Sequence, residues 1–276
     1  YDGQGQLRWI HDELRLARPG EGRRGEAIGV WHDVTESRLA EQLRETRIAV
    51  LDGLASNRPL PHILEEIVSR LEALHPDLRV SILLSEPRSG LLFTGAAPSL
   101  PAFFNEAVNG LKPGIGHGSC GTSAFTGEMV IVEDIRVHAY WAAYADLAER
   151  AGLRACWSIP FKDKSGQVLG TFGIYYAQPR PPNQNELDMI GEFARIAGLA
   201  VERSRADASQ RQAAAVFEST REGVVITDLQ PRIVSVNAAY TAITGYAETE
   251  VVGRNPSLLQ SGREDQAFYR TMWDSI

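Results

Sequence analysis

The chain has 276 residues, 43% of them hydrophobic, so it can bury one or two substantial cores. Acidic and basic residues are interspersed and the formal net charge is −7, which predicts neither a nucleic-acid surface nor a lipid-binding patch. No apolar run approaches the roughly 20 residues that span a bilayer, and two cysteines are too few for a disulfide framework. We therefore expect a cytoplasmic chain without membrane contact.

The first 34 residues indicate a β-hairpin followed by a helix. Residues 6–16 and 27–34 alternate apolar and polar side chains around a glycine-rich loop. Asp33 and Thr35 come next, and either side chain can accept a hydrogen bond from the first turn of a helix. That helix is predicted to run from there to about residue 56, with apolar side chains at roughly heptad spacing.

The central part of the chain mixes helical and strand patterns. Amphipathic helices are predicted at 61–74, 100–111 and 139–151, and strands at 79–85, 91–96, 129–133, 154–161 and 167–177. Residues 162–166, Lys-Asp-Lys-Ser-Gly, form a short polar loop between the last two strands, so these strands should pair antiparallel. The predicted fold class is α+β.

A second long helix and a further mixed segment complete the chain. The helical pattern resumes at about Asn183, after a proline-rich stretch, and continues past Ser209. From Ala213 onward a short helix, two short strands and further short helices are predicted. Because the chain begins with Tyr1 and its last helical pattern stops at Ile276 without a cap, we expect it to be a segment of a longer protein.

Both ends of the chain resemble parts of PAS domains. Residues 222–228 (EGVVITD), 233–240 (IVSVNAAY), 243–246 (ITGY) and 252–256 (VGRNP) follow one another in the order found in the first half of that domain. The opening residues DGQGQLRW and GVWHDVTESRLAEQ look like the closing strands and exit helix of another PAS domain. The resemblance implies an incomplete PAS domain at each end.

The middle resembles a GAF domain of bacterial sensors. The motifs that carry the resemblance are residues 115–122 (IGHGSCGT), 130–135 (VIVEDI), 152–160 (GLRACWSIP) and 168–176 (VLGTFGIYY). The resemblance implies an antiparallel sheet with a ligand pocket on one face. The expected division is 1–35 as the end of a PAS domain, 36–58 as a connecting helix, 59–180 as the GAF domain, 181–212 as a second connecting helix, and 213–276 as the start of another PAS domain.

The PAS–GAF–PAS order looks like the input region of enzymes that make or degrade cyclic di-GMP, with GGDEF or EAL domains downstream. Sensor histidine kinases use the same modules and are the alternative. Both interpretations make this segment a regulatory one, with any catalytic output domain beyond Ile276. Fold alone does not decide between these outputs.

The stretch from His117 to Gly121 offers the most chemistry. A helix that follows these residues would lower the pKa of the Cys120 thiol, which is therefore either a reactive or ligand-contacting group or a small buried side chain in a tight turn. Free-methionine-sulfoxide reductases have a similar glycine–cysteine–glycine turn, but they need further cysteines at the pocket mouth. Between Asp134 and Cys156 this chain has none, so we predict no turnover.

Metal and cofactor chemistry receives little support. A structural zinc site needs about four ligands, and His117 with Cys120 supplies two, so no metal site is predicted. Haem binding through His117 or His138 stays open. Light-sensing PAS relatives have a cysteine after Gly-Arg-Asn, where this chain has Pro256, so no flavin–cysteinyl adduct is expected. The cofactor or signal is otherwise unknown.

Aromatic residues are concentrated in the GAF-like segment. They either line a pocket for a planar or small apolar molecule or fill an ordinary interface between sheet and helices. A cyclic nucleotide would need positive charge for its phosphate, and only Arg136 and Arg154 lie near the motifs. The candidate pocket residues are His117, Cys120, Asp134, Tyr140, Trp141, Cys156, Trp157 and Tyr175.

The two long helices predict a parallel homodimer that relays the signal. Their heptad stripes are imperfect, which suits a helix pair with two registers of similar energy. The residues expected to take part in the relay are Asp33, Thr35, Leu43 and Val201. The alternative is that each stripe packs on the GAF domain of its own chain.

Overall fold

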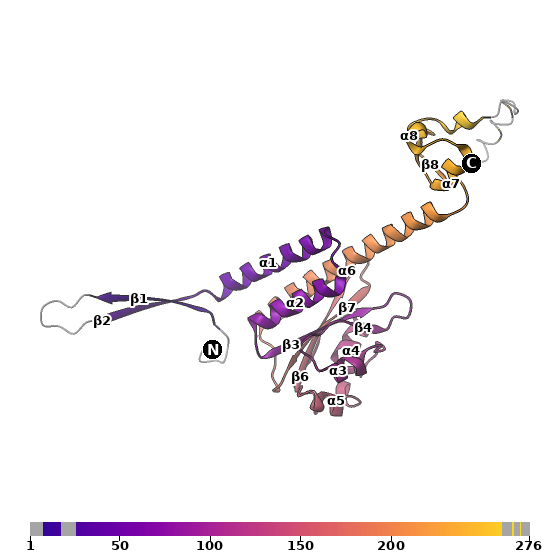
Figure 1. Cartoon of the computed structure of the whole chain (residues 1–276). Helices are drawn as coiled ribbons and strands as arrows, with labels where there is room; N and C mark the ends of the chain where they lie inside the picture. The colour runs from indigo at the N-terminus through magenta and orange to yellow at the C-terminus, as the bar shows by residue number, and fades with distance from the viewer. Residues whose placement is uncertain (1–7, 18–25, 261–266, 268–270, 272–276) are drawn as a thin grey trace. The chain divides into compact units, whose positions relative to one another are not determined.

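The computed structural model describes residues 8–17, 26–260, 267 and 271 (Figure 1). The chain divides into two compact units, Tyr1–Ser204 and Arg205–Ile276. Within the described ranges, no helix is long and apolar enough to cross a membrane.

The N-terminal hairpin leads directly into a helix, as predicted. Strands β1 (Ile10–Ala17) and β2 (Glu26–Asp33) pair antiparallel, and helix α1 covers Thr35–Ala55. The carboxylate of Asp33 accepts a hydrogen bond from the backbone N–H of Thr35 at 3.0 Å, whereas the Thr35 hydroxyl accepts from the backbone N–H of Trp9 at 2.9 Å. Asp33 therefore assists the helix start, and Thr35 ties it to the hairpin.

Five antiparallel strands form the central sheet. They are β3 (Leu78–Ser85), β4 (Leu92–Ala96), β5 (Val130–Val132), β6 (Ala155–Lys162) and β7 (Val168–Tyr176), in the spatial order β4-β3-β7-β6-β5. The predicted hairpin between β6 and β7 is confirmed. Its loop is closed by the carboxylate of Asp163, which accepts from the backbone N–H groups of Ser165 at 2.8 Å and Gln167 at 3.0 Å.

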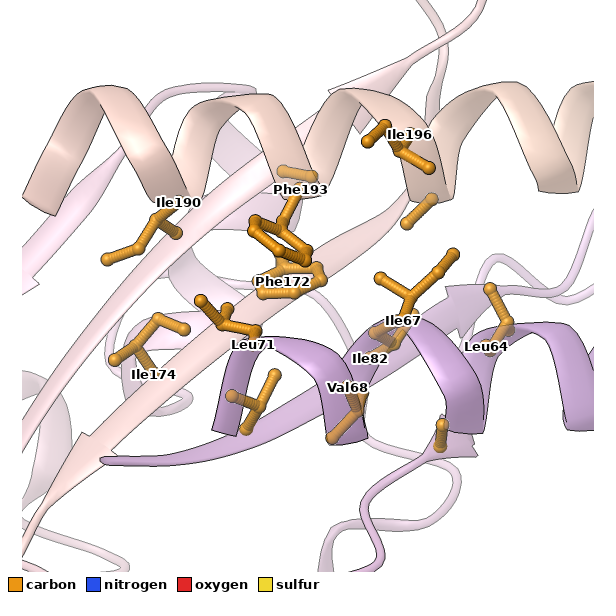
Figure 2. Packing of buried hydrophobic residues seen from close by; sticks show 14 of the residues in the cluster. Leu64, Ile67, Val68, Leu71, Ile82, Phe172, Ile174, Ile190, Phe193 and Ile196 are labelled. Carbon is orange, nitrogen blue, oxygen red and sulfur yellow. The ribbon is translucent and has the colours of Figure 1, made fainter. Parts of the chain in front are cut away.

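One face of the sheet is covered by α2 (Leu60–Leu74) and α6 (Gln184–Ser219). Figure 2 shows the apolar side chains that meet there: Leu64, Ile67, Val68 and Leu71 from α2, Ile82, Phe172 and Ile174 from the sheet, and Ile190, Phe193 and Ile196 from α6. Alternate strand residues supply the sheet's share because successive side chains point to opposite faces. Each such side chain contributes about 1.5–3 kcal/mol when fully buried.

Helix α6 begins with a reciprocal pair of hydrogen bonds. The side-chain oxygen of Asn183 accepts from the Glu186 N–H, and the Glu186 carboxylate accepts from the Asn183 N–H, both at 2.9 Å. This capping box satisfies two backbone donors that the helix cannot pair. The predicted connecting helix of residues 181–212 continues to Ser219, because neither glycine nor proline interrupts the chain between Gly198 and Gly223.

Short helices cover the opposite face of the sheet. They are α3 (Ala102–Val108), α4 (Gly118–Thr126), the 3-10 turn η1 (Ala139–Trp141) and α5 (Ala145–Arg150). The single helix predicted for 139–151 is therefore a turn followed by a short helix. The predicted α+β class, with an antiparallel sheet at the centre of the GAF-like segment, is confirmed.

The second unit has its own small core. It contains β8 (Val225–Thr227), β9 (Ile233–Val236), α7 (Ala238–Thr244), α8 (Glu248–Val251) and the 3-10 turn η2 (Pro256–Leu259). Asn237 organises the unit, because its side-chain oxygen accepts from Val224 N–H at 2.8 Å and Tyr240 N–H at 3.0 Å. The last of the short helices predicted after Ala213, at residues 267–273, falls almost entirely outside the described residues.

Candidate functional site: the pocket beside helix α4

A pocket lies between the sheet and the short helices of the second face. Its wall is mostly apolar, with four aromatic rings, and its lining residues are Leu83, Phe104, Val108, Leu111, His117, Gly118, Ser119, Cys120, Trp141, Tyr144, Leu147 and Tyr175. The cavity volume is about 20 Å³, which is room for about one water molecule. We call it the α4 pocket.

The floor of the α4 pocket is set by strand β7. Tyr175 points into the pocket, and its ring meets that of Phe104 edge-on, with centroids 5.8 Å apart. Two residues earlier, Gly173 leaves space for polar atoms, because a Cβ there would lie 2.8 Å from both the Cys120 sulfur and the Ser81 hydroxyl oxygen. The missing side chain thus allows Ser81, Cys120 and Tyr175 to meet.

A chain of two hydrogen bonds joins the outer wall to the sheet. The indole N–H of Trp141, in η1, donates to the hydroxyl oxygen of Ser119 at 2.9 Å. Ser119, in the first turn of α4, donates in turn to the backbone carbonyl of Cys156 at 3.1 Å. Because all three residues are buried, these bonds fix η1 over α4 and α4 over β6.

Cys120 lies among hydroxyl and thiol groups. Its sulfur is 3.7 Å from the Tyr175 hydroxyl, which is also 3.2 Å from the Ser81 hydroxyl. Hydrogen bonding from Cys156, together with Ser158 and Tyr175, lowers the pKa of Cys120 to about 6 against the opposing effect of burial. Burial raises the pKa values of Cys156 and Tyr175, so Cys120 is the most acidic member of this group.

His117 stands at the rim of the α4 pocket. It precedes α4, is half-buried, and its ring lies 6.5 Å from that of Tyr144. Within the described part of the chain, its imidazole nitrogens make no hydrogen bond, so they are available to a molecule in the pocket. His138 is occupied differently, because its Nδ1 accepts from the Tyr140 N–H at 3.2 Å.

The structure brings together five of the eight predicted pocket residues. His117, Cys120, Trp141 and Tyr175 line the α4 pocket, and Cys156 lies behind Cys120 on β6.

The other three predicted pocket residues lie elsewhere. Trp157 faces α2 and α6, where its ring lies 4.8 Å from that of Tyr176. It follows Cys156 directly on β6, and neighbours on a strand cannot share a face. The Asp134 carboxylate pairs with Arg136 at 2.6 Å, and the Tyr140 ring packs on His138.

Several pocket residues were missed because they carry no chemical motif. Phe104 and Val108 lie four residues apart on α3, and this helical spacing was their available signal. Leu83 and Leu147 are ordinary apolar residues in the sequence. Ser119 lies inside the His-Gly-Ser-Cys-Gly stretch, but its role depends on an indole 22 residues away.

The relay residues Leu43 and Val201 pack inside their own chain. Val201 is fully buried in the core between α6 and the sheet, and Leu43 is half-buried against the same core. These two side chains therefore do not form an exposed seam, because Val201 packs over the chain's own sheet and Leu43 lies on α1, which packs against α2. Their packing matches the alternative interpretation, in which each stripe packs on the GAF domain of its own chain.

Charge is absent from the lining of the α4 pocket. None of its lining residues is Asp, Glu, Lys or Arg. The two arginines considered for a phosphate each have a carboxylate partner, Asp134 for Arg136 and Glu149 for Arg154 at 3.1 Å. Across the described ranges, no three His, Cys, Asp or Glu side chains are grouped closely enough to hold a metal ion.

Comparison with known proteins assigns both units. The family model described as "GAF domain" matches residues 57–202, and the model described as "PAS fold" matches residues 211–276. The methyl sulfide methyltransferase-associated sensor of Methanosarcina acetivorans is 30% identical over 253 residues, which are 90% of this chain and 25% of that protein.

Two further comparisons are more limited. The two-component sensor PprA of Pseudomonas aeruginosa is 51% identical over 41 residues, which are 15% of this chain and 4% of that protein. The chain thus spans a quarter or less of the length of these curated relatives. The structure of free methionine-R-sulfoxide reductase from Neisseria meningitidis covers 64% of this chain and 95% of its own, with 20% identity and a TM-score of 0.47. Because the GAF model spans more than half of the 276 residues, the chain belongs to the GAF domain family.

Proposed function

We propose that this chain is a sensory input segment that binds a small, uncharged, largely apolar molecule in the α4 pocket. The observation that carries the proposal is the composition of the lining, which combines four aromatic rings and several aliphatic side chains with a few polar groups and no charge. Ligand sites are typically built in this way. The His117 imidazole supplies the polar contact that orients the molecule, and no turnover is assigned to this segment.

Binding requires the outer wall of the α4 pocket to move. The cavity holds about one water molecule in this structure, so a larger ligand must displace side chains. Residues 139–150 form that wall, and the Trp141–Ser119 hydrogen bond attaches it to α4. Opening of this wall would couple ligand entry to α4 and β6.

The signal then has a short route to helix α6. Tyr175 faces the pocket, and the next residue, Tyr176, faces the other side of the sheet. The Tyr176 hydroxyl donates to the Glu186 carboxylate at 3.5 Å, and the Arg180 guanidinium lies 4.5 Å from the Tyr176 ring centroid. Because Glu186 caps α6, a shift of β7 would reach the start of the long helix.

The proposal also covers the type of output domain that this segment regulates. The sequence motifs favour a cyclic di-GMP cyclase or phosphodiesterase downstream, acting in the cytoplasm as a homodimer. A sensor histidine kinase is the second candidate, and the name of one relative, the two-component sensor PprA, favours it. The reading frame beyond Ile276 decides between a GGDEF or EAL domain and a kinase.

Indole and cyclic AMP distinguish the proposed ligand class from an anionic one. Indole, which is neutral and aromatic, should raise the melting temperature of the purified chain, and cyclic AMP should not. At 100 times the dissociation constant the expected stabilisation is about 2.7 kcal/mol. Val108→Phe fills the pocket and should abolish the shift, whereas Val137→Phe, at a position 82% exposed, should keep it. Stabilisation by cyclic AMP alone, or an indole shift that survives Val108→Phe, would contradict the proposal.

A further inference from the structure

Both cysteines of the chain lie together on the pocket face of the sheet. Cys120 is in the first turn of α4 and lines the pocket, and Cys156 is on β6, in the same buried cluster as the pocket residues Tyr175 and Trp141. The two elements are held close by the Ser119 hydroxyl, which donates to the Cys156 carbonyl at 3.1 Å. Tyr175, the register partner of Cys156, contacts the Cys120 sulfur as well. Both thiols are free and buried.

Two buried hydroxyl groups beside Cys120 lack ordinary partners. The Ser158 and Thr171 hydroxyls are fully buried, and within the described part of the chain neither has a hydrogen-bond partner. Buried hydroxyls without partners are rare in folded proteins and call for an explanation. Ser158 is the register partner of Gly173, beside which the Cys120 sulfur lies, and Thr171 is two residues before Gly173 on the same face of β7. A thiolate there would accept hydrogen bonds from both, so the cluster is complementary to a negatively charged sulfur.

The two cysteines differ in reactivity. Hydrogen bonds lower the pKa of Cys120, whereas burial raises that of Cys156. Cys120 also borders the pocket, which has room for a molecule about as small as water. Cys156 lies behind it without pocket exposure. Cys120 is therefore suited to meet a small oxidant, and Cys156 to react with the oxidised product.

We propose that Cys120 and Cys156 form a peroxide-sensitive dithiol that closes to a disulfide between α4 and β6. This inference goes beyond ligand binding and does not depend on it. The oxidant is hydrogen peroxide, and the product is an intramolecular bond within one chain.

The reaction proceeds in two balanced steps. The Cys120 thiolate attacks one oxygen of hydrogen peroxide, so that an S–O bond forms, the O–O bond breaks and hydroxide leaves. The sulfur of Cys156 then attacks that of Cys120, so that the S–S bond forms, the S–O bond breaks and a second hydroxide leaves. The two hydroxides take up the two thiol protons. The dithiol is oxidised by two electrons, and peroxide is reduced to two molecules of water.

The test treats the folded chain of residues 1–276 with hydrogen peroxide, then denatures it and adds N-ethylmaleimide. Mass spectrometry should show the loss of two hydrogen atoms, no alkylation at either cysteine, and a peptide pair joined through Cys120 and Cys156. Dithiothreitol should restore both thiols. Three results would overturn the proposal. In the wild-type chain, Cys156 could still be alkylated after Cys120 is oxidised, or disulfides could form only between chains, or neither cysteine could be oxidised.

Two variants separate the roles of the cysteines. In Cys156→Ala the first step has no resolving thiol, so dimedone should trap a sulfenic acid at Cys120. In Cys120→Ala the remaining Cys156 should resist peroxide, because it is buried behind the pocket. Rapid oxidation of Cys156 in Cys120→Ala would contradict the assigned order. Peroxide treatment of the wild-type chain in urea is the control that shows whether the native fold is required.

Discussion

The two faces of the central sheet are built on different principles. The face under α2 and α6 is filled by aliphatic and aromatic side chains from both helices and from alternate strand residues (Figure 2). The opposite face, together with α4 that covers it, carries the hydroxyls of Ser81, Ser119, Ser158 and Thr171, both cysteines, and a pocket. Strand β7 contributes to both faces, since Phe172 faces α2 and α6 and Gly173 faces the pocket.

This difference separates stability from sensing. A close-packed apolar interface resists deformation, and truncation of a side chain within it lowers the free energy of unfolding. Buried polar groups instead have alternative partners and protonation states, and a cavity leaves space for movement. The GAF unit thus places its stability on one face and its adjustable chemistry on the other, with β7 shared between them.

Truncation of Phe172 should give the largest effect. Phe172→Ala removes a fully buried ring from the filled face and should lower the free energy of unfolding by about 3–5 kcal/mol. Phe125→Ala removes the same ring at a position on α4 that is 61% exposed, and should change it by less than about 0.5 kcal/mol. Urea denaturation measures both. Similar losses for the two variants would remove the basis for assigning stability to the α2–α6 face.

A matched pair of serines should show an intermediate effect on the pocket face. Ser119→Ala leaves the Trp141 indole N–H without its acceptor and the Cys156 carbonyl without its donor. This should cost about 1–3 kcal/mol. Ser158 is equally buried, but its hydroxyl has no partner in the described structure.

The control is Ser158→Ala, measured by urea denaturation at about pH 5, below the pKa of Cys120. It should leave the free energy of unfolding nearly unchanged, because replacing an unpaired hydroxyl removes no hydrogen bond. Equal losses in the two variants would show that the Trp141–Ser119–Cys156 connection contributes nothing.

Sequence periodicity was sufficient for most of the fold. The five strands of the sheet lie within about two residues of their predicted ends, because β-branched and aromatic runs were bounded by polar loops such as residues 162–166. The antiparallel pairing of β6 and β7 followed from the shortness of that loop. Local signals decided these features.

The candidate site was only partly predictable, because it depends on which way each side chain points. Trp157 and Cys156 are neighbours in one motif, and only the register of β6 shows that Trp157 faces α2 and α6. The apolar stripe that includes Val201 was compatible with a partner helix or with the chain's own sheet, and tertiary packing chose the sheet. The hydroxyls around Cys120 come from different strands, so no linear motif brings them together.

The smallest expected effect is a shift in the pKa of Cys120, and it tests whether the pocket face stabilises a thiolate. The difference in thiolate ultraviolet absorbance between the wild-type chain and Cys120→Ala should follow a titration with a midpoint at about 6. Below it the sulfur is a thiol, and above it a thiolate. The titratable groups nearest to it, Cys156 and Tyr175, have raised pKa values and stay protonated through this range.

Thr171→Val keeps the shape of the side chain and removes one of the hydroxyls that lower the pKa of Cys120. A hydrogen bond to a charged group contributes about 1.5 kcal/mol, so the midpoint should rise by about one pH unit. Thr94 is the matched control, because its hydroxyl oxygen is also buried without a partner in the described structure but belongs to β4 and does not contribute to the pKa of Cys120. Thr94→Val should leave the midpoint where it is. If both variants shift the midpoint equally, the hydroxyls act through general packing, and the pocket face has no special complementarity to a thiolate. If only Thr171→Val shifts the midpoint, the contrast between the two faces extends to individual hydrogen bonds.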